Sequence, residues 1–334
     1  MVRKGLIGSL VFVASLLILF GFRLYSLRSA TAPALSETTT TLPNIQKVIV
    51  LAVNDMQNPI SEELTTAIKQ LVMDNENLRA VILDAQGLRR RQSEQLQQLD
   101  RSSLAAVILL PVANLDDLDG PISQLNQAGV PVISLNQPAM DSSLLTAHVI
   151  RIGYDALEAG RQQAAFCARQ LGGQGQVVIL AGPENQGITQ QMLSGVREVF
   201  RNFPGISVAD IQFGDWSRKS GMVSMSRSLQ EHQVLSAIIA QNDEMLLGAL
   251  PLIAEQNSQS VKIGNGATSE GLRSLSQGYI EATISINSRQ IARDAFNAVM
   301  AAINGDVAAD ELLQPQLIDS SNLQSYVREI WNIN

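Results

Sequence analysis

The strongest constraint on the fold is a unit that recurs along the sequence from residue 45: a short apolar run rich in β-branched residues, a turn, and a stretch with helical spacing. Near-continuous apolar runs of this length are typical of parallel strands that helices cover on both faces. Strands that alternate with helices over this length predict an α/β protein with doubly wound parallel sheets. The predicted strands are residues 47–53, 80–83, 105–109, 130–135, 176–180, 206–213, 237–240, 261–263 and 281–286.

Carboxamide side chains recur where these strands end. Ligands of doubly wound sheets bind in the crevice beyond the carboxyl ends of the strands, so these positions are candidates for a binding site. A carboxamide both donates and accepts hydrogen bonds, which suits a neutral ligand with hydroxyl groups, although asparagine is also a common turn residue. The candidate ligand-binding residues found in this way are Asn58, Asn136, Gln137, Asn242, Asn265 and Asn287.

The sequence gives little support for catalysis, a metal or a cofactor. His148 and His232 are the only two histidines, and neither has metal-ligand spacing. The glycine cluster at residues 172–175 follows a predicted helix and precedes a strand, which is the reverse of the order in a phosphate-binding loop. The single Cys167 excludes an internal disulfide and is expected to be a buried apolar residue. We therefore expect no enzymatic activity, no metal and no cofactor.

The first 28 residues are expected to target the chain to a membrane. Residues 5–22 are uncharged and apolar, with Arg3 and Lys4 before them and Arg23 and Arg28 after them. At about 1.5 Å per residue this run can cross a bilayer, and it exceeds the roughly 7–15 residues of an ordinary cleaved signal core. We expect an apolar N-terminal helix that anchors the protein to the inner membrane, with a cleaved signal peptide as the alternative. A flexible linker is expected over residues 29–44.

Several segments, taken together, resemble the ribose-type periplasmic solute-binding proteins, in the sugar-binding branch of that family. The strongest is AIIAQNDEMLLGAL at residues 237–250, which is similar to the signature segment of the family. Other similar segments follow in the order that the family has them. They are NP at 58–59, GVPVIS at 129–134, IGYDALEAGRQQA at 152–164 and IGNGATSEGLRSLSQGYIEATI at 263–284.

The resemblance implies two lobes joined by a hinge that the chain crosses three times. The N-terminal lobe would comprise residues 45–147 and 286–313, and the C-terminal lobe residues 148–285 and 314–334. A ligand would lie in the cleft between the lobes, and closure of the hinge would bury it.

The resemblance also adds two candidate site residues and exposes departures from the family. Trp216 corresponds to an aromatic wall of the cleft, and Gln190 stands where the family has an arginine. Asn136 and Gln137 stand where the family has an Asp-Arg pair, and Gly266 where it has an aspartate. The charged groups with which the family holds sugars are thus largely replaced by neutral ones.

These features predict an envelope-located, periplasmic solute-binding protein that closes on a small neutral polar ligand, of sugar or polyol type, and delivers it to the membrane permease of an ABC importer. The alternative is a membrane-tethered module that senses the ligand and signals to a sensor kinase or receptor. Nucleic acid is not an expected partner, because the net charge is −7 and no basic stripe is present.

Overall fold

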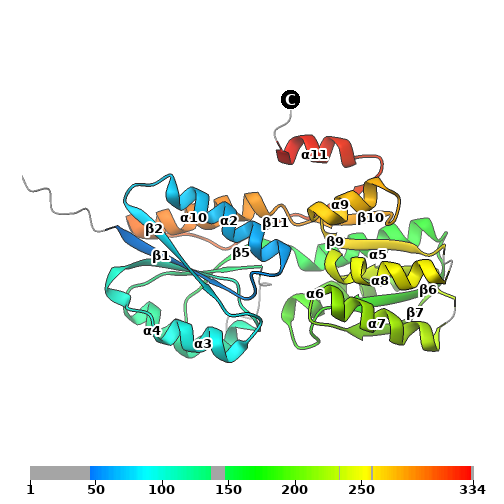
Figure 1. Ribbon diagram of the computed structural model, residues 1–334, viewed down its shortest axis with the longest axis horizontal. Coiled ribbons are helices and arrows are strands. Elements are labelled where there is room, and N and C mark those ends of the chain that lie inside the picture. The colour runs from blue at the N-terminus through cyan, green and yellow to red at the C-terminus, as the bar shows by residue number, and fades with distance from the viewer. Residues whose placement is uncertain (1–45, 137–146, 233, 257–258, 332–334) are drawn as a thin grey trace, which may run out of the picture. The chain divides into compact units, whose positions relative to one another are not determined.

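The computed structural model describes residues 46–136, 147–232, 234–256 and 259–331, which form two lobes, each built on one six-stranded sheet (Figure 1). The apolar helix expected over residues 5–22 and the linker expected over residues 29–44 lie outside these ranges. Within the described ranges, no helix is both long enough and apolar enough to span a bilayer. The predicted pair of doubly wound parallel-sheet lobes is confirmed.

The first sheet is covered by helices on both faces because its interior strands, such as β1, are apolar on both sides. In β1, Ile49 and Leu51 belong to the core on one face, whereas Val48 and Val50 belong to the core on the other. Helices α2 and α10 cover the first face, and α3 and α4 cover the second. All neighbouring strands are parallel, in the order β11 (Glu311–Leu313), β5 (Ile150–Tyr154), β4 (Val132–Leu135), β3 (Leu104–Leu109), β1 (Lys47–Val53) and β2 (Leu78–Asp84). The helices are α2 (Pro59–Met73), α3 (Arg89–Gln97), α4 (Asp119–Gln127) and α10 (Ser288–Asn304), with 3₁₀ turns at Arg101–Ser103 and Leu115–Leu118.

The second sheet repeats this arrangement. In β6, Val177 and Ile179 face the core under α5 and α6, whereas Val178 and Leu180 face the core under α7 and α8. Only β12 runs antiparallel to its neighbour among the described strands. The order is β12 (Gln316–Asp319), β10 (Ala282–Ser285), β9 (Val261–Gly266), β8 (Ala237–Ala240), β6 (Gln174–Ala181) and β7 (Gly205–Phe213). The helices are α5 (Ala156–Gln170), α6 (Gly187–Phe200), α7 (Arg218–Glu231), α8 (Asp243–Glu255), α9 (Ser269–Ser276) and α11 (Leu323–Trp331).

The chain passes between the sheets three times, after β5, after β10 and after β11. The first crossing therefore follows Tyr154 and does not lie at the expected boundary between residues 147 and 148. The missed strand β5 contains Arg151, whose Nε pairs with Asp310 Oδ2 at 2.8 Å, so its sequence is not a continuous apolar run. Strands β11 and β12 were also not predicted, because they are short and partly exposed.

In the second lobe, helices α5 and α6 pack closely against each other at glycine residues, and so do α7 and α8. A Cβ atom added at Gly160 of α5 would collide with the backbone oxygen of Met192 in α6, and one added at Gly195 of α6 would collide with that of Leu157. Gly221 and Gly248 have the same role where α7 crosses α8. These contacts leave no room for a methyl group at either crossing.

We predict that Gly160→Ala lowers the free energy of unfolding by about 1–3 kcal/mol, because the added methyl forces α5 and α6 apart. Gly120→Ala in α4 is the matched control, since no atom lies within 4 Å of a Cβ added there. The control should be neutral or more stable by up to about 1 kcal/mol, because alanine favours a helix over glycine. Urea denaturation followed by circular dichroism measures both variants, and equal effects would contradict the close crossing.

Candidate functional site

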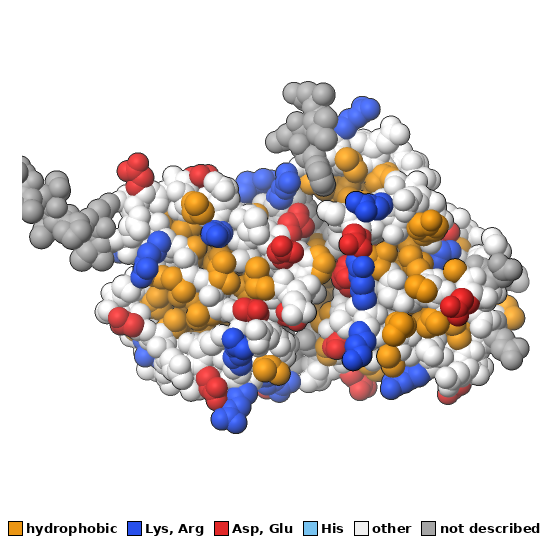
Figure 2. Space-filling model, viewed as in Figure 1, with side chains coloured by type: hydrophobic (Ala, Val, Ile, Leu, Met, Phe, Trp, Pro, Cys, Tyr) orange, Lys and Arg blue, Asp and Glu red, His pale blue; other side chains and the backbone are white. Residues whose placement is uncertain are grey.

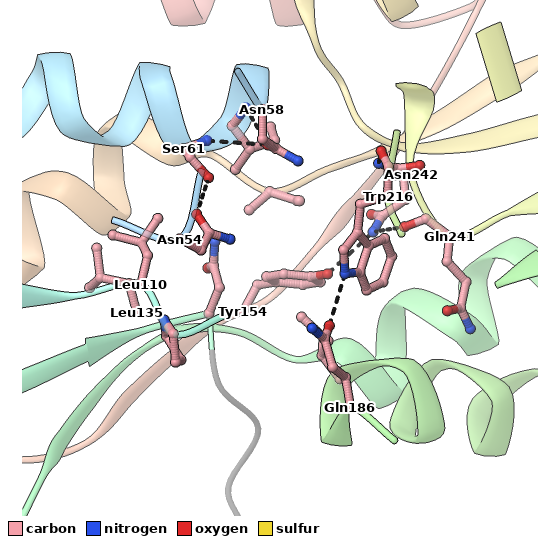
Figure 3. A pocket seen from close by; sticks show the side chains of 16 residues that line it. Asn54, Asn58, Ser61, Leu110, Leu135, Tyr154, Gln186, Trp216, Gln241 and Asn242 are labelled. Atoms are coloured by element: carbon pink, nitrogen blue, oxygen red, sulfur yellow. Dashed lines mark hydrogen bonds between the residues drawn. The ribbon is translucent and has the colours of Figure 1, made fainter. Parts of the chain in front are cut away.

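A cleft between the lobes is lined by residues at the carboxyl ends of strands from both sheets (Figure 3). With the open space at its mouth included, its volume is about 700 Å³. No Asp, Glu, Lys, Arg or His is among the sixteen residues that line it. They are Asn54, Asn58, Ile60, Ser61, Leu110, Pro111, Leu135, Asn136, Tyr154, Gln186, Ile188, Trp216, Gln241, Asn242, Asn265 and Ile286.

The first-lobe wall is built by two asparagines whose oxygens are already used. Asn54 follows β1, and its Oδ1 accepts from Ser61 Oγ at 2.7 Å. Asn58 is the N-cap of α2, and its Oδ1 accepts from Ile60 N at 3.0 Å and Ser61 N at 3.3 Å. Neither Nδ2 donates to another described residue, so both amides keep donors for a ligand.

The second-lobe wall is the indole ring of Trp216, which several contacts hold in place. The indole Nε1 donates to Gln186 Oε1 at 2.8 Å, and the backbone oxygen of Trp216 accepts from Asn242 Nδ2 at 2.7 Å. Asn242 is itself fixed as the N-cap of α8, where its Oδ1 accepts from Met245 N at 2.9 Å. The ring also lies against Gly182, where any Cβ would overlap it. Figure 3 shows Trp216 across the cleft from Asn54 and Ser61, with Tyr154 between them.

The floor of the cleft is a buried polar network that joins the two lobes. Asn265 of β9 is 2 % exposed, and its Nδ2 donates to Tyr154 OH at 3.2 Å and to Gln241 O at 3.0 Å. A backbone oxygen can only accept, so the bond to Gln241 fixes which way the Asn265 amide points. Gln241 Oε1 accepts from Gly182 N and its Nε2 donates to Thr189 O, so both polar atoms of this side chain have a partner in the second lobe. Burial raises the pKa of Tyr154 to about 12.

Two acceptors in the cleft lining have no partner. Asn136 Oδ1 and Asn265 Oδ1 are both buried and accept no hydrogen bond from a described residue. An unsatisfied buried acceptor costs about 1–3 kcal/mol, so a group that donates to these oxygens gains an equivalent advantage. Both oxygens are closed to solvent in this arrangement, so a ligand hydroxyl group would supply such a donor only if it displaced the side chains around them.

Several charged side chains beside the cleft pair with one another. Arg218 Nε donates to Glu244 Oε2 at 2.6 Å, and the same guanidinium pairs with Glu270. These acidic partners raise the pKa of Arg218. Figure 2 shows acidic and basic side chains gathered on the second lobe beside the boundary between the lobes. Arg218 and Glu244 line a neighbouring hollow that shares Asn54, Asn58, Gln186 and Trp216 with the cleft, and Asp55 and Lys219 line it too. Charged groups therefore stand beside the cleft, although none is among the sixteen described residues that line the cleft itself.

The structure brings Asn58, Asn136, Trp216, Asn242 and Asn265 of the predicted set to the cleft. Their contact with a ligand stays a prediction. Gln137 lies outside the described residues.

Two predicted residues lie elsewhere. Gln190 turns away from the cleft within α6 and donates from Nε2 to Glu184 O at 2.6 Å, and Gln186, one turn earlier, lines the cleft instead. Asn287 is exposed and serves as the N-cap of α10, where its Oδ1 accepts from Gln290 N at 3.2 Å. The preceding Ile286 lines the cleft in its place.

Five polar lining residues were not predicted. Asn54 and Gln241 each directly follow a predicted strand, so the rule that selected the other amides could have found them. Tyr154 was missed together with its strand β5. Ser61 and Gln186 carry no sequence signal, because their place depends on how a loop and a helix turn are packed.

Comparison with known proteins identifies relatives that match most of this chain. A family model described as "Periplasmic binding protein domain" matches residues 49–306. The ribose import binding protein RbsB of Bacillus subtilis is 25% identical over 272 residues, which is 81% of this chain and 87% of that protein.

Solved structures share the fold. An ABC transporter solute-binding protein from Bacillus halodurans with bound myo-inositol aligns with a TM-score of 0.78 at 22% identity, over 84% of this chain and 97% of that one. The fructose-binding periplasmic domain of a hybrid two-component system aligns with a TM-score of 0.76 at 18% identity, over 86% and 95%.

We predict that the buried phenol of Tyr154 makes the fold sensitive to alkali. Its pKa rises from 10.0 to about 12 on folding, so the unfolded chain loses this proton first. The contribution is intact below pH 10 and is lost as the pH rises toward 12. Tyr154→Phe should flatten the fall in unfolding free energy over that interval, measured by urea denaturation at several pH values. Tyr326, whose pKa also rises to about 12, remains in both proteins. An unchanged slope would contradict the burial of the Tyr154 hydroxyl.

Proposed function

The chain belongs to the periplasmic binding protein family, and from this membership we propose that it binds a small neutral ligand of the sugar or polyol class in the cleft and delivers it to an ABC importer. It holds the ligand by closing and catalyses no reaction. The family places it in the periplasm.

The uncharged lining of the cleft is the observation that carries this proposal. An ionised ligand would lose its hydration without meeting an opposite charge, which costs several kcal/mol or more. The hydroxyl groups of a neutral compound can instead replace their lost hydration with hydrogen bonds. The amides of Asn54 and Asn58 have unused donors, and those of Asn136 and Asn265 have acceptors without a described partner. The ring of Trp216 offers an apolar face for the carbon skeleton of such a compound.

The relatives support this ligand class and this partner. One curated relative is named for ribose import, and one structural relative is an ABC transporter solute-binding protein that holds myo-inositol. Both compounds are uncharged and carry several hydroxyl groups. The amide and indole groups of this cleft differ from the charged groups expected of the family, so we propose a neutral ligand without naming one sugar.

A tethered sensor is the second candidate, since one structural relative is the periplasmic domain of a two-component system and residues 5–22 could anchor the chain. Membrane fractionation and N-terminal sequencing of the native protein separate the two functions. An intact N-terminus in the membrane fraction favours the sensor. A released chain that begins beyond residue 28 favours the importer.

A thermal-shift screen of residues 45–334 against neutral sugars, polyols and furanosyl compounds tests the proposed ligand class. We predict a rise in melting temperature with at least one of them, since a ligand that binds only the folded state stabilises it. Trp216→Ala should abolish the shift, and Gln190→Ala should keep it because Gln190 lies outside the cleft. No shift with any compound would overturn the carbohydrate assignment.

Asn136→Gly tests the unpartnered acceptor. Asn136 has a φ of +52°, which glycine adopts freely, and its Oδ1 has no partner to lose. We predict that the free protein changes in stability by no more than about 1 kcal/mol. The affinity for the ligand found in the screen should fall about tenfold, which corresponds to about 1.4 kcal/mol. Isothermal titration calorimetry measures the affinity, and an unchanged value would show that no ligand group donates to Asn136.

A further inference from the structure

The lobes also contact each other directly beside the cleft, through the segment that follows β3 and the segment that precedes α6. Asn114 Nδ2 donates to Asn185 O at 2.7 Å, and Asn114 Oδ1 accepts from Gly187 N at 3.0 Å. Gln186 Nε2 donates to Val112 O at 2.8 Å. Three hydrogen bonds thus join two short segments, one from each lobe.

One of these bonds completes the N-terminus of α6. The first backbone N–H groups of a helix have no acceptor within the helix, and a side chain at the N-cap usually supplies one. In the second lobe, α5, α7, α8 and α9 are each capped by the side chain of their own N-cap residue. The N-cap residue of α6, Gln186, makes no such bond. Asn114 takes over this role from the opposite lobe, so α6 gains its cap only when the lobes meet.

Gln186 connects this contact to the aromatic wall. Its Oε1 accepts from Trp216 Nε1 at 2.8 Å while its Nε2 donates to Val112 O of the first lobe. A single side chain therefore links the indole ring to the opposite side of the cleft. If the lobes separate, Gln186 loses its anchor on the first lobe and holds Trp216 less firmly.

We propose that Asn114 and Gln186 form a closure latch, in which Asn114 caps α6 across the cleft and Gln186 sets the indole of Trp216 as the lobes close. This proposal rests on the proposed function in one respect: we take closure of the lobes to be the movement that binds the ligand. Its bonds join protein groups alone, so it favours the closed arrangement of the ligand-free protein and can be tested without any ligand.

The distance between spin labels on the two lobes tests the latch. Labels are attached at Gln97→Cys on α3 and Ser226→Cys on α7, both exposed positions. The native Cys167 does not compete, because it is buried and its pKa is raised to about 12. The variant Asn114→Ala removes both bonds of that side chain. Asn185→Ala is the matched control, because the latch uses only its backbone oxygen.

In the labelled protein that keeps Asn114, pulsed electron resonance without ligand should show the short distance between labels that corresponds to closed lobes. Asn114→Ala should lower the ratio of closed to open molecules about tenfold, equivalent to about 1.4 kcal/mol. Asn185→Ala should leave the ratio unchanged. A distribution unaffected by Asn114→Ala, an equal effect of Asn185→Ala, or no closed population in the parent protein would each overturn the latch.

Fluorescence of Trp216 tests the link through Gln186. In a Trp331→Phe background, Trp216 is the only tryptophan. Gln186→Met should shift its emission maximum, since Nε1 loses its partner, and Asn114→Ala should shift it in the same direction. An emission maximum unchanged by Asn114→Ala would overturn the link. Both experiments are read without ligand, so failure of the latch can be distinguished from failure of the proposed ligand class.

Discussion

The N-termini of helices impose the constraint on which this site depends. In a doubly wound sheet each helix begins just beyond the carboxyl end of a strand, so unpaired backbone N–H groups collect at the edge where the lobes face each other. Asn58 satisfies them for α2 and Asn242 for α8, while Asn114 does so for α6 from the other lobe. The amides that cap the helices are thereby fixed in position, and some of their remaining hydrogen-bonding groups face the cleft.

The same fixed amides give the cleft its selectivity. An amide presents partial charges without a full one, so it can hold hydroxyl groups while giving no compensation to an ionised ligand. Some of the full charges beside the cleft pair with one another, as in the cluster of Arg218, Glu244 and Glu270. Asn136 and Asn265 then provide acceptors that the protein itself leaves unpaired.

The sequence predicted the sheets well and the site only in part, for physical reasons. Central strands such as β1 are buried on both faces and show as apolar runs, whereas β5 carries the paired Arg151 and was missed, which displaced the first crossing. Asparagines at strand ends were recognised, but a sequence cannot distinguish an amide that only caps a helix, as Asn287 does, from one that also lines the cleft, as Asn242 does. Gln186 was beyond reach, because its role comes from contacts between lobes.

The central claim is that the cleft accepts hydroxyl groups and rejects charge. Isothermal titration calorimetry of the best neutral sugar or polyol, beside the carboxylate obtained by oxidising one of its primary alcohols, tests this claim most directly. The account predicts that the neutral compound binds at least about a hundredfold more tightly, which corresponds to about 2.7 kcal/mol. Equal or tighter binding of the carboxylate would contradict it.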